Sequence, residues 1–175
     1  MTALRRHPVL VAVVVAAVLL GLATAVLFVW PRRDTPAPAD AIVVLNGDGH
    51  REQKGIELAQ RGLAPVLVFS EADPVREPAC RLTLPHVKTL CFAPSPATTQ
   101  GESEAIARLA TQYGWHRILV VVSRPQASRA RLRLRRCYAG RFEIQTVPVP
   151  LVDLPWSVAY EWGAMVKALV WQRQC

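Results

Sequence analysis

Hydrophobic and polar positions divide the chain into an apolar N-terminal run and a longer region where short apolar runs alternate with amphipathic segments. The first run, residues 8–30, has no charged side chain and is long enough to cross the hydrocarbon core of a bilayer as a helix. Trp30, at its far end, is typical of an interfacial anchor. We therefore predict a transmembrane helix at 8–30 that tethers the protein to a lipid bilayer, preceded by a short basic segment at 1–7.

Two other interpretations of this run compete with the anchor. Ala23-Thr24-Ala25 resembles a signal-peptide cleavage site, but apolar residues continue to Trp30, which favours an uncleaved anchor. A buried helix of a soluble core fits less well, because no polar position interrupts the run. Arginines flank the run on both sides, so the preference of basic residues for the cytoplasm does not by itself orient the helix.

A proline-rich linker at 31–39 separates this run from residues 40–175, whose length suits one domain with its own core. Continuous apolar runs that are too short for buried helices are typical of strands covered on both faces, as in a parallel sheet. Three such runs are strong and two are weaker, at 41–45, 66–69, 118–122, 87–92 and 143–147.

Helical patterns lie between and after these strands. One covers about 50–61, one begins at Thr99 with a predicted Thr99/Glu102 capping box, one begins at Pro125, and one runs from Trp156 to about 171. Strands that alternate with helices indicate βαβ crossovers. We predict an α/β fold: a Rossmann-like three-layer domain with a mainly parallel sheet, preceded by one N-terminal transmembrane helix.

The last predicted helix is mostly apolar, with Glu161 and Lys167 as its only charged residues. We expect it to be nearly buried at the edge of the domain. The alternative is that it rests against the bilayer, with Trp156, Trp162 and Trp171 near the lipid headgroups.

The chain carries a formal net charge of +8, and part of this charge lies in an arginine block at 124–136 that contains no acidic residue. Such a block can face an anionic lipid surface, a phosphorylated ligand or nucleic acid, or can be a solvated helix face. The predicted anchor and the lack of aromatic residues among the arginines argue against nucleic acid.

The four cysteines form no C-x-x-C pair, so no structural zinc site is expected. Cys80 and Cys91 flank a short segment with a central proline, and in an oxidising compartment they are candidates for a disulfide. In the cytoplasm they would be reduced thiols. Cys137 shares a predicted helical face with apolar residues, so we expect it in the core. The cysteines favour a domain on the extracytoplasmic side of the plasma membrane.

Candidate binding residues cluster after the predicted strands, because ligands of open parallel sheets bind at the carboxyl ends of strands. The glycine-containing turn after the first strand supplies backbone N–H donors, and arginines supply cations for phosphate. The predicted ligand-binding residues are Asn46, Gly47, Gly49, Arg51, Ser70, Thr98, Thr99, Glu102, Ser123, Arg124, Gln126 and Arg129. Each also has an ordinary interpretation as a turn, capping or solvated residue.

Asp48 and Glu71 are the candidate catalytic residues, as a general base or as ligands of a cation that bridges phosphates. No G-x-S-x-G elbow, phosphate-binding P-loop or H-E-x-x-H motif is present, so we predict no metal centre of a known type and no particular cofactor.

These segments, in their order and spacing, resemble the YdcF/ElyC/SanA-type domain of unknown function, a bacterial envelope-associated family. The resemblance covers about residues 40–139. Its motifs are a D-x-I-V-V-L strand with a glycine-rich turn and an arginine, a G-x-A-P hinge before a strand that ends in serine, a T-x-x-E helix start, and S-x-x-H-x-x-R-A. Here these lie at 40–51, 62–70, 99–102 and 123–130.

The chain departs from the family pattern at three positions: Gln126 replaces the usual histidine, Asn46 replaces a glycine, and Glu71 stands where S-G-G would continue. Glutamine keeps hydrogen bonding but does not titrate. The resemblance implies a membrane-tethered protein of cell-envelope biogenesis or barrier maintenance, with nucleotide-like ligands. The tethered basic site favours a phosphorylated envelope precursor or lipid carrier as the ligand. The alternatives are a non-catalytic binding module and a cytoplasm-facing domain that binds a nucleotide or S-adenosylmethionine.

Overall fold

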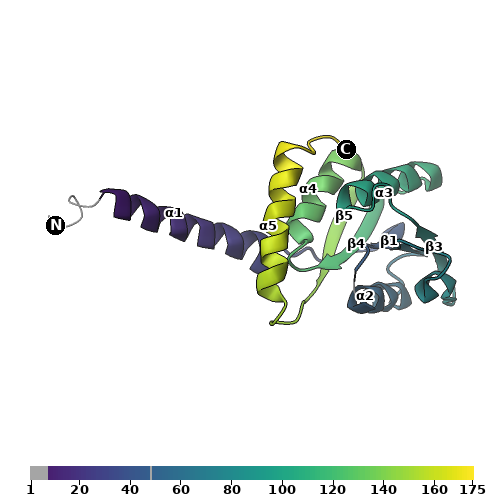
Figure 1. Cartoon of the computed structure of the whole chain (residues 1–175). Helices are drawn as coiled ribbons and strands as arrows, with labels where there is room; N and C mark the ends of the chain where they lie inside the picture. The colour runs from purple at the N-terminus through teal and green to yellow at the C-terminus, as the bar shows by residue number, and fades with distance from the viewer. Residues whose placement is uncertain (1–7, 48) are drawn as a thin grey trace.

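Five parallel strands form one sheet in the order β3-β2-β1-β4-β5, with helices on both of its faces (Figure 1). The computed structural model describes residues 8–47 and 49–175. The predicted α/β fold with a parallel sheet is confirmed. The strands are β1 (Ala41–Val44), β2 (Val66–Ser70), β3 (Lys88–Phe92), β4 (Arg117–Ser123) and β5 (Arg141–Val147).

The helices connect the strands and supply the two outer layers. They are α1 (Pro8–Thr24), α2 (Gly49–Gln60), α3 (Thr99–Tyr113), α4 (Ala127–Cys137) and α5 (Leu154–Val170), with a π-helical turn η2 (Ala25–Val29) and a 3-10 turn η3 (Pro78–Arg81). One sheet face packs against α2 and η3, and the other packs against α3 and α4.

The central strands show why continuous apolar runs appear in the sequence. In β1, Val43 packs in the cluster of α3 and α4, while Ile42 and Val44 pack in the cluster of α2. All four residues of β1 are buried, because both faces of the sheet are covered. Reversal of the strand order between β1 and β4 leaves an opening at their carboxyl ends, where ligands of such sheets bind.

The first turn of α3 differs from the expected capping box. Thr98, not Thr99, is the N-cap: its hydroxyl accepts a hydrogen bond from the Gly101 N–H at 3.3 Å. The Glu102 carboxylate accepts instead from the backbone N–H of Asn46, at 2.8 Å. The capping-box prediction is therefore wrong, because Thr99 and Glu102 make their contacts with other elements of the fold.

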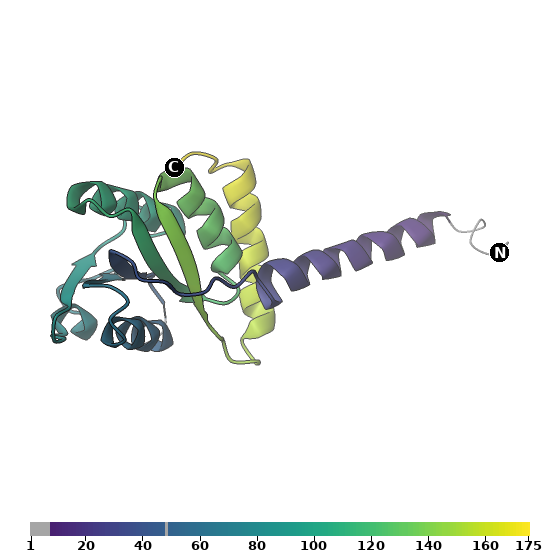
Figure 2. The ribbon, with the colours of Figure 1, turned by 180° about the vertical axis from the view of Figure 1, so that it is seen from behind.

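The N-terminal helix α1 projects away from the domain, as Figures 1 and 2 show from opposite sides. Within the described residues, Pro8–Val29 is the one helix long and apolar enough to cross a membrane, and its most apolar stretch is not buried. Its last turn, η2, returns to the domain: Phe28 is fully buried and its ring lies 5.2 Å from that of Trp162, edge to face. A helix of this kind is suited to a membrane anchor or a signal sequence.

The proline-rich linker lies along the domain. Asp34 accepts hydrogen bonds from the Ile144 N–H at 2.9 Å and from the Arg131 guanidinium at 2.7 Å, so the linker follows β5 and α4 (Figure 2). Further on, Asp40 accepts from the N–H groups of His116 and Arg117. These hydrogen bonds lower the pKa of the Asp40 carboxyl, the one from Arg117 most strongly. The N-terminal helix is therefore joined to the domain by a segment that is hydrogen-bonded to it.

The expectation that the last helix is nearly buried is wrong. Only Glu161, Met165 and Ala168 of α5 are buried. Trp156 is 77% exposed, and Val166 and Leu169 are about half exposed. The physical reason is that α5 packs against α4 and η2 outside the three-layer core, so that much of its surface is left exposed.

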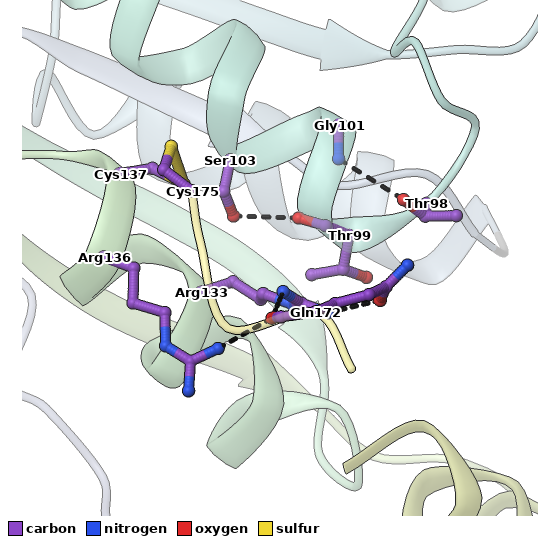
Figure 3. The surroundings of a disulfide bond; sticks show 9 residues. All are labelled: Thr98, Thr99, Gly101, Ser103, Arg133, Arg136, Cys137, Gln172 and Cys175. Atoms are coloured by element: carbon purple, nitrogen blue, oxygen red, sulfur yellow. Dashed lines mark hydrogen bonds between the residues drawn. A yellow bond between two sulfur atoms is a disulfide. The ribbon is translucent and has the colours of Figure 1, made fainter. Parts of the chain in front are cut away.

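Two disulfides join the four cysteines. Cys80 and Cys91 are bonded, as predicted, and link η3 to β3 with their Cα atoms 5.7 Å apart. Cys137, expected in the core, is only partly buried and pairs with Cys175 instead (Figure 3). This second disulfide fastens the C-terminal segment after α5 to the end of α4.

Gly101 allows a close approach between α3 and the loop before it. A Cβ atom at this position would lie 2.0 Å from the backbone oxygen of Pro96. We predict that Gly101→Ala lowers the free energy of unfolding by about 1–3 kcal/mol, because backbone atoms must move apart. Circular dichroism melting of the full chain in detergent would measure the change.

Gly163→Ala is the matched control, because a Cβ there meets nothing within 4 Å. In the helix α5 this change should raise stability by about 0.5–1 kcal/mol. Equal melting temperatures for Gly101→Ala and wild type would contradict the close-packing argument.

Candidate functional site

A pocket of about 630 Å³ opens at the carboxyl ends of β1 and β4, where the strand order reverses. Its wall comes from the β1–α2 turn, the start of α3, the β4–α4 turn, and the side of α5. Eight of the predicted site residues line it: Asn46, Arg51, Thr98, Thr99, Glu102, Ser123, Gln126 and Arg129.

A chain of hydrogen bonds crosses this pocket. The Arg51 guanidinium donates to the Gln126 side-chain oxygen at 2.9 Å and to the Asn46 backbone oxygen. The Gln126 amide donates in turn to the Thr99 hydroxyl at 3.0 Å. Arg129 donates to the same hydroxyl at 2.6 Å. Segments far apart in the sequence are thereby held in one polar network.

Gly47 has a specific part in this arrangement. A Cβ at Gly47 would lie 2.1 Å from the guanidinium carbon of Arg51. The absence of a side chain therefore lets Arg51 fold back over the turn toward Gln126. Gly47 itself is not in the pocket wall.

Arg129 and Glu161 form a buried ion pair between α4 and α5. Arg129 Nε and Nη2 donate to the two Glu161 oxygens, each at 2.7 Å, and both residues are less than a tenth exposed. Burial lowers the pKa of Arg129, but hydrogen bonding and charge attraction from Glu161 reverse the effect and raise the pKa overall. Parallel double hydrogen bonds of this kind fix orientation as well as distance.

Glu102 supplies a buried carboxyl to the wall of the pocket. Burial raises its pKa, and the Asn46 N–H, the nearby Ser70 hydroxyl and the positive charges of Arg51 and Arg129 oppose that effect. Ser70 is fully buried, and in the described part of the chain its hydroxyl has no hydrogen-bond partner of normal geometry. The protonated form of Glu102 is therefore favoured more than in water.

The two candidate catalytic residues are not placed in the pocket wall. Asp48 lies outside the described residues. Glu71 is half-buried and does not line the pocket; burial, together with the charges of Glu77, Glu52 and Glu102, raises its pKa to about 7. Glu71 thus titrates near neutral pH, in an acidic neighbourhood beside the pocket.

The other predicted ligand residues lie outside the wall as well. Gly49 begins α2, and Arg124 is partly exposed, with its backbone N–H bonded to the Val147 oxygen. The prediction that the site residues meet at one edge of the sheet therefore holds for most residues around the ends of β1 and β4. It does not hold for every predicted residue that follows a strand.

The contribution of α5 was not predicted. Residues on one side of this helix and just before it complete the pocket: Asp153, Trp156, Ser157, Tyr160, Glu161, Ala164 and Lys167. The signal was a four-residue spacing of polar positions at 153, 157 and 161, which marks one polar stripe on an otherwise apolar helix.

Arg133, one turn after Arg129, was also missed. It is buried and donates to the backbone and side-chain oxygens of Gln172 (Figure 3), while burial lowers the pKa of its guanidinium. The described wall thus contains the cations Arg51, Arg129, Arg133 and Lys167 and the acids Glu102, Asp153 and Glu161.

Within 8–47 and 49–175, no three His, Cys, Asp or Glu side chains lie close enough together to hold a metal ion. The described pocket wall contains neither histidine nor cysteine. The arrangement is suited to binding an anion through guanidinium groups, hydroxyls and the N-terminus of α3.

No protein-family model matches the chain, and no curated protein matches its sequence. The resemblance to the YdcF/ElyC/SanA-type family therefore stays a prediction.

The Arg129–Glu161 pair provides a test of how α5 is held. We predict that Glu161→Gln lowers the free energy of unfolding by about 3–5 kcal/mol, because the buried guanidinium loses its counter-charge. Denaturant unfolding of the full chain in detergent would measure it.

Glu57→Gln is the control, because Glu57 forms exposed pairs with Lys54 and Arg61. This control should change stability by less than about 1 kcal/mol. A Glu161→Gln variant as stable as Glu57→Gln would show that the buried pair does not hold α5 in place.

Proposed function

We propose that this chain is a membrane-anchored protein that binds a phosphorylated or nucleotide-like anion in the pocket at the carboxyl ends of β1 and β4. By its resemblance to the YdcF/ElyC/SanA-type family, it would serve cell-envelope biogenesis or barrier maintenance. The ligand class would be a phosphorylated envelope precursor or lipid carrier.

The observation that carries this proposal is the network of Arg51, Gln126, Thr99 and Arg129 across the pocket. Two guanidinium groups from different elements face the same space as the start of α3. An anion that entered this space would meet positive charge and polar hydrogen-bonding groups together, which is the chemistry that recognises phosphate.

Two aromatic side chains in the pocket wall favour a ligand that also carries a ring or an apolar part. Trp156 is 77% exposed and Tyr160 is 61% exposed, although both line the pocket. Exposed aromatic rings beside a cationic pocket are suited to stacking on a base or packing on an apolar chain.

Binding without turnover is the second candidate function. Gln126 replaces the histidine of the resembled family. Its side chain donates a hydrogen bond to Thr99, accepts one from Arg51 and does not titrate. If the site turns over a substrate, Glu102 or Glu71, whose pKa values are raised, are the candidate bases.

Arg51→Gln tests the anion site. We expect it to weaken binding at least about tenfold, because a charge-assisted hydrogen bond to phosphate is lost. Calorimetric titration of the full chain in detergent with pyrophosphate, a nucleoside diphosphate and S-adenosylmethionine would measure the affinities.

Arg124→Gln is the matched control, because Arg124 follows β4 but does not line the pocket. It should bind like wild type. Equal affinities of wild type and Arg51→Gln, or selective binding of S-adenosylmethionine alone, would contradict the anion site.

The two disulfides support an extracytoplasmic domain, since such bonds persist in oxidising compartments. We therefore expect alkaline phosphatase fused after Cys175 to be active in cells. Green fluorescent protein at the same position should stay dark. The mass of the membrane-bound protein should be that of the uncleaved chain. The reverse reporter pattern would favour the cytoplasm-facing alternative, and a shortened soluble product would favour a cleaved signal sequence.

A further inference from the structure

The side of α5 that faces away from the pocket is apolar, and beyond the contact of Trp162 with η2 it is largely exposed. Val158, Trp162, Val166 and Leu169 follow one another at helical spacing, and Val170 lies beside them. Val166, Leu169 and Val170 are 43–49% exposed. We call this stripe, with Ala159, the outer face of α5.

No charge interrupts the outer face. The two charged residues of α5 lie on its other sides: Glu161 is buried against Arg129, and Lys167 lines the pocket. The helix is thus divided lengthwise into a polar pocket side and an apolar side, the pattern of a helix that lies at a membrane interface.

The anchor joins the domain at this same face. The indole N–H of Trp162 donates to the Thr24 hydroxyl at 3.0 Å, and the Trp162 ring packs on Phe28 of η2. In Figures 1 and 2, α5 lies across the end of α1, and the sheet and the other helices lie beyond it. A bilayer crossed by α1 would therefore meet α5 before any other part of the sheet domain.

The length of the described anchor helix favours the contact. α1 (Pro8–Thr24) has 17 residues, its last residue Thr24 already contacts Trp162, and η2, which follows, packs against α4 and α5. At 1.5 Å per residue this helix is about 26 Å long, while the hydrocarbon core is about 30 Å thick. The helix is thus about 4 Å shorter than the hydrocarbon core, so a helix that spans the core draws the attached end of the domain toward it by about that distance. This is close to the lower end of the depth of about 5–10 Å at which interfacial helices bury their apolar face.

Basic residues follow both the anchor and α5 in the sequence. Arg32 and Arg33 are exposed just after the anchor, and Arg173 is exposed just after α5. Anionic phospholipids attract such residues within a few ångströms of the surface. Their position is consistent with a membrane surface at the level of α5.

We propose that the outer face of α5 lies in the interface of the bilayer that α1 spans, so that α5 is a second membrane contact parallel to the surface. The inference rests on the anchoring part of the proposed function. The pocket, with Trp156 and Tyr160, lies on the opposite side of the same helix, about one helix diameter (about 10 Å) from the headgroups and within reach of a lipid-borne phosphate.

Spin-label accessibility tests this contact on the full chain in vesicles of phosphatidylethanolamine and phosphatidylglycerol. A nitroxide is attached through a ketone-bearing residue at Val166, because all four cysteines are in disulfides. The same label at Val14 in α1 reports the membrane interior. At Val75, which is 83% exposed near η3, it reports water.

We expect collisions with oxygen to exceed those with a water-soluble nickel complex several-fold at Val14 and Val166, and the reverse at Val75. Apolar accessibility at Val14 with aqueous accessibility at Val166 would overturn the α5 contact and leave the anchor intact. Aqueous accessibility at Val14 would overturn the anchor and with it the contact. Low accessibility of Val166 to both probes would mean that a protein, such as a second copy of the chain, covers the face.

Discussion

The buried ion pair between Arg129 and Glu161 is the interaction on which the arrangement of the carboxyl edge depends. It joins α4, which belongs to the sheet layers, to α5, which does not touch the sheet core. Neither charge is stable in that environment without the other, so α5 cannot move away from α4 without a large cost in free energy. Thr99, which accepts a hydrogen bond from the same arginine, extends the constraint to α3.

Because α5 is held in this position, its two sides have different surroundings. One side closes the pocket over the ends of β1 and β4, and the other carries the largely exposed apolar stripe beside α1. The C-terminal segment adds further restraint through the Cys137–Cys175 disulfide and through Gln172, whose backbone oxygen accepts a hydrogen bond from Arg136 (Figure 3). Arg136 also donates to the Ala168 oxygen of α5. The proposed ligand site and the proposed membrane contact are thus opposite sides of one helix.

The parts of the site that follow strands β1 and β4 were predictable. Parallel strands end at the same edge, so Asn46, Arg51, Ser123 and Gln126 were expected together and line one pocket. Glu71 and Arg124 also follow strands but lie outside its wall, because a position after a strand does not determine which side chains of the loop face the opening. Thr99 and Glu102 were assigned to a capping box. Local spacing does not reveal that Glu102 accepts a hydrogen bond from Asn46 and Thr99 accepts one from Arg129.

The sequence by itself determined the apolar helix, the alternation of strands and helices, the covered parallel sheet and the Cys80–Cys91 pairing, because each depends on local composition, periodicity or short loops. Tertiary structure alone decided the place of α5, its pairing through Glu161 with Arg129, the Cys137–Cys175 disulfide and the burial of the last turn of the N-terminal apolar helix. These features join residues that are 32 to 138 positions apart, and no short-range pattern records which distant surfaces meet.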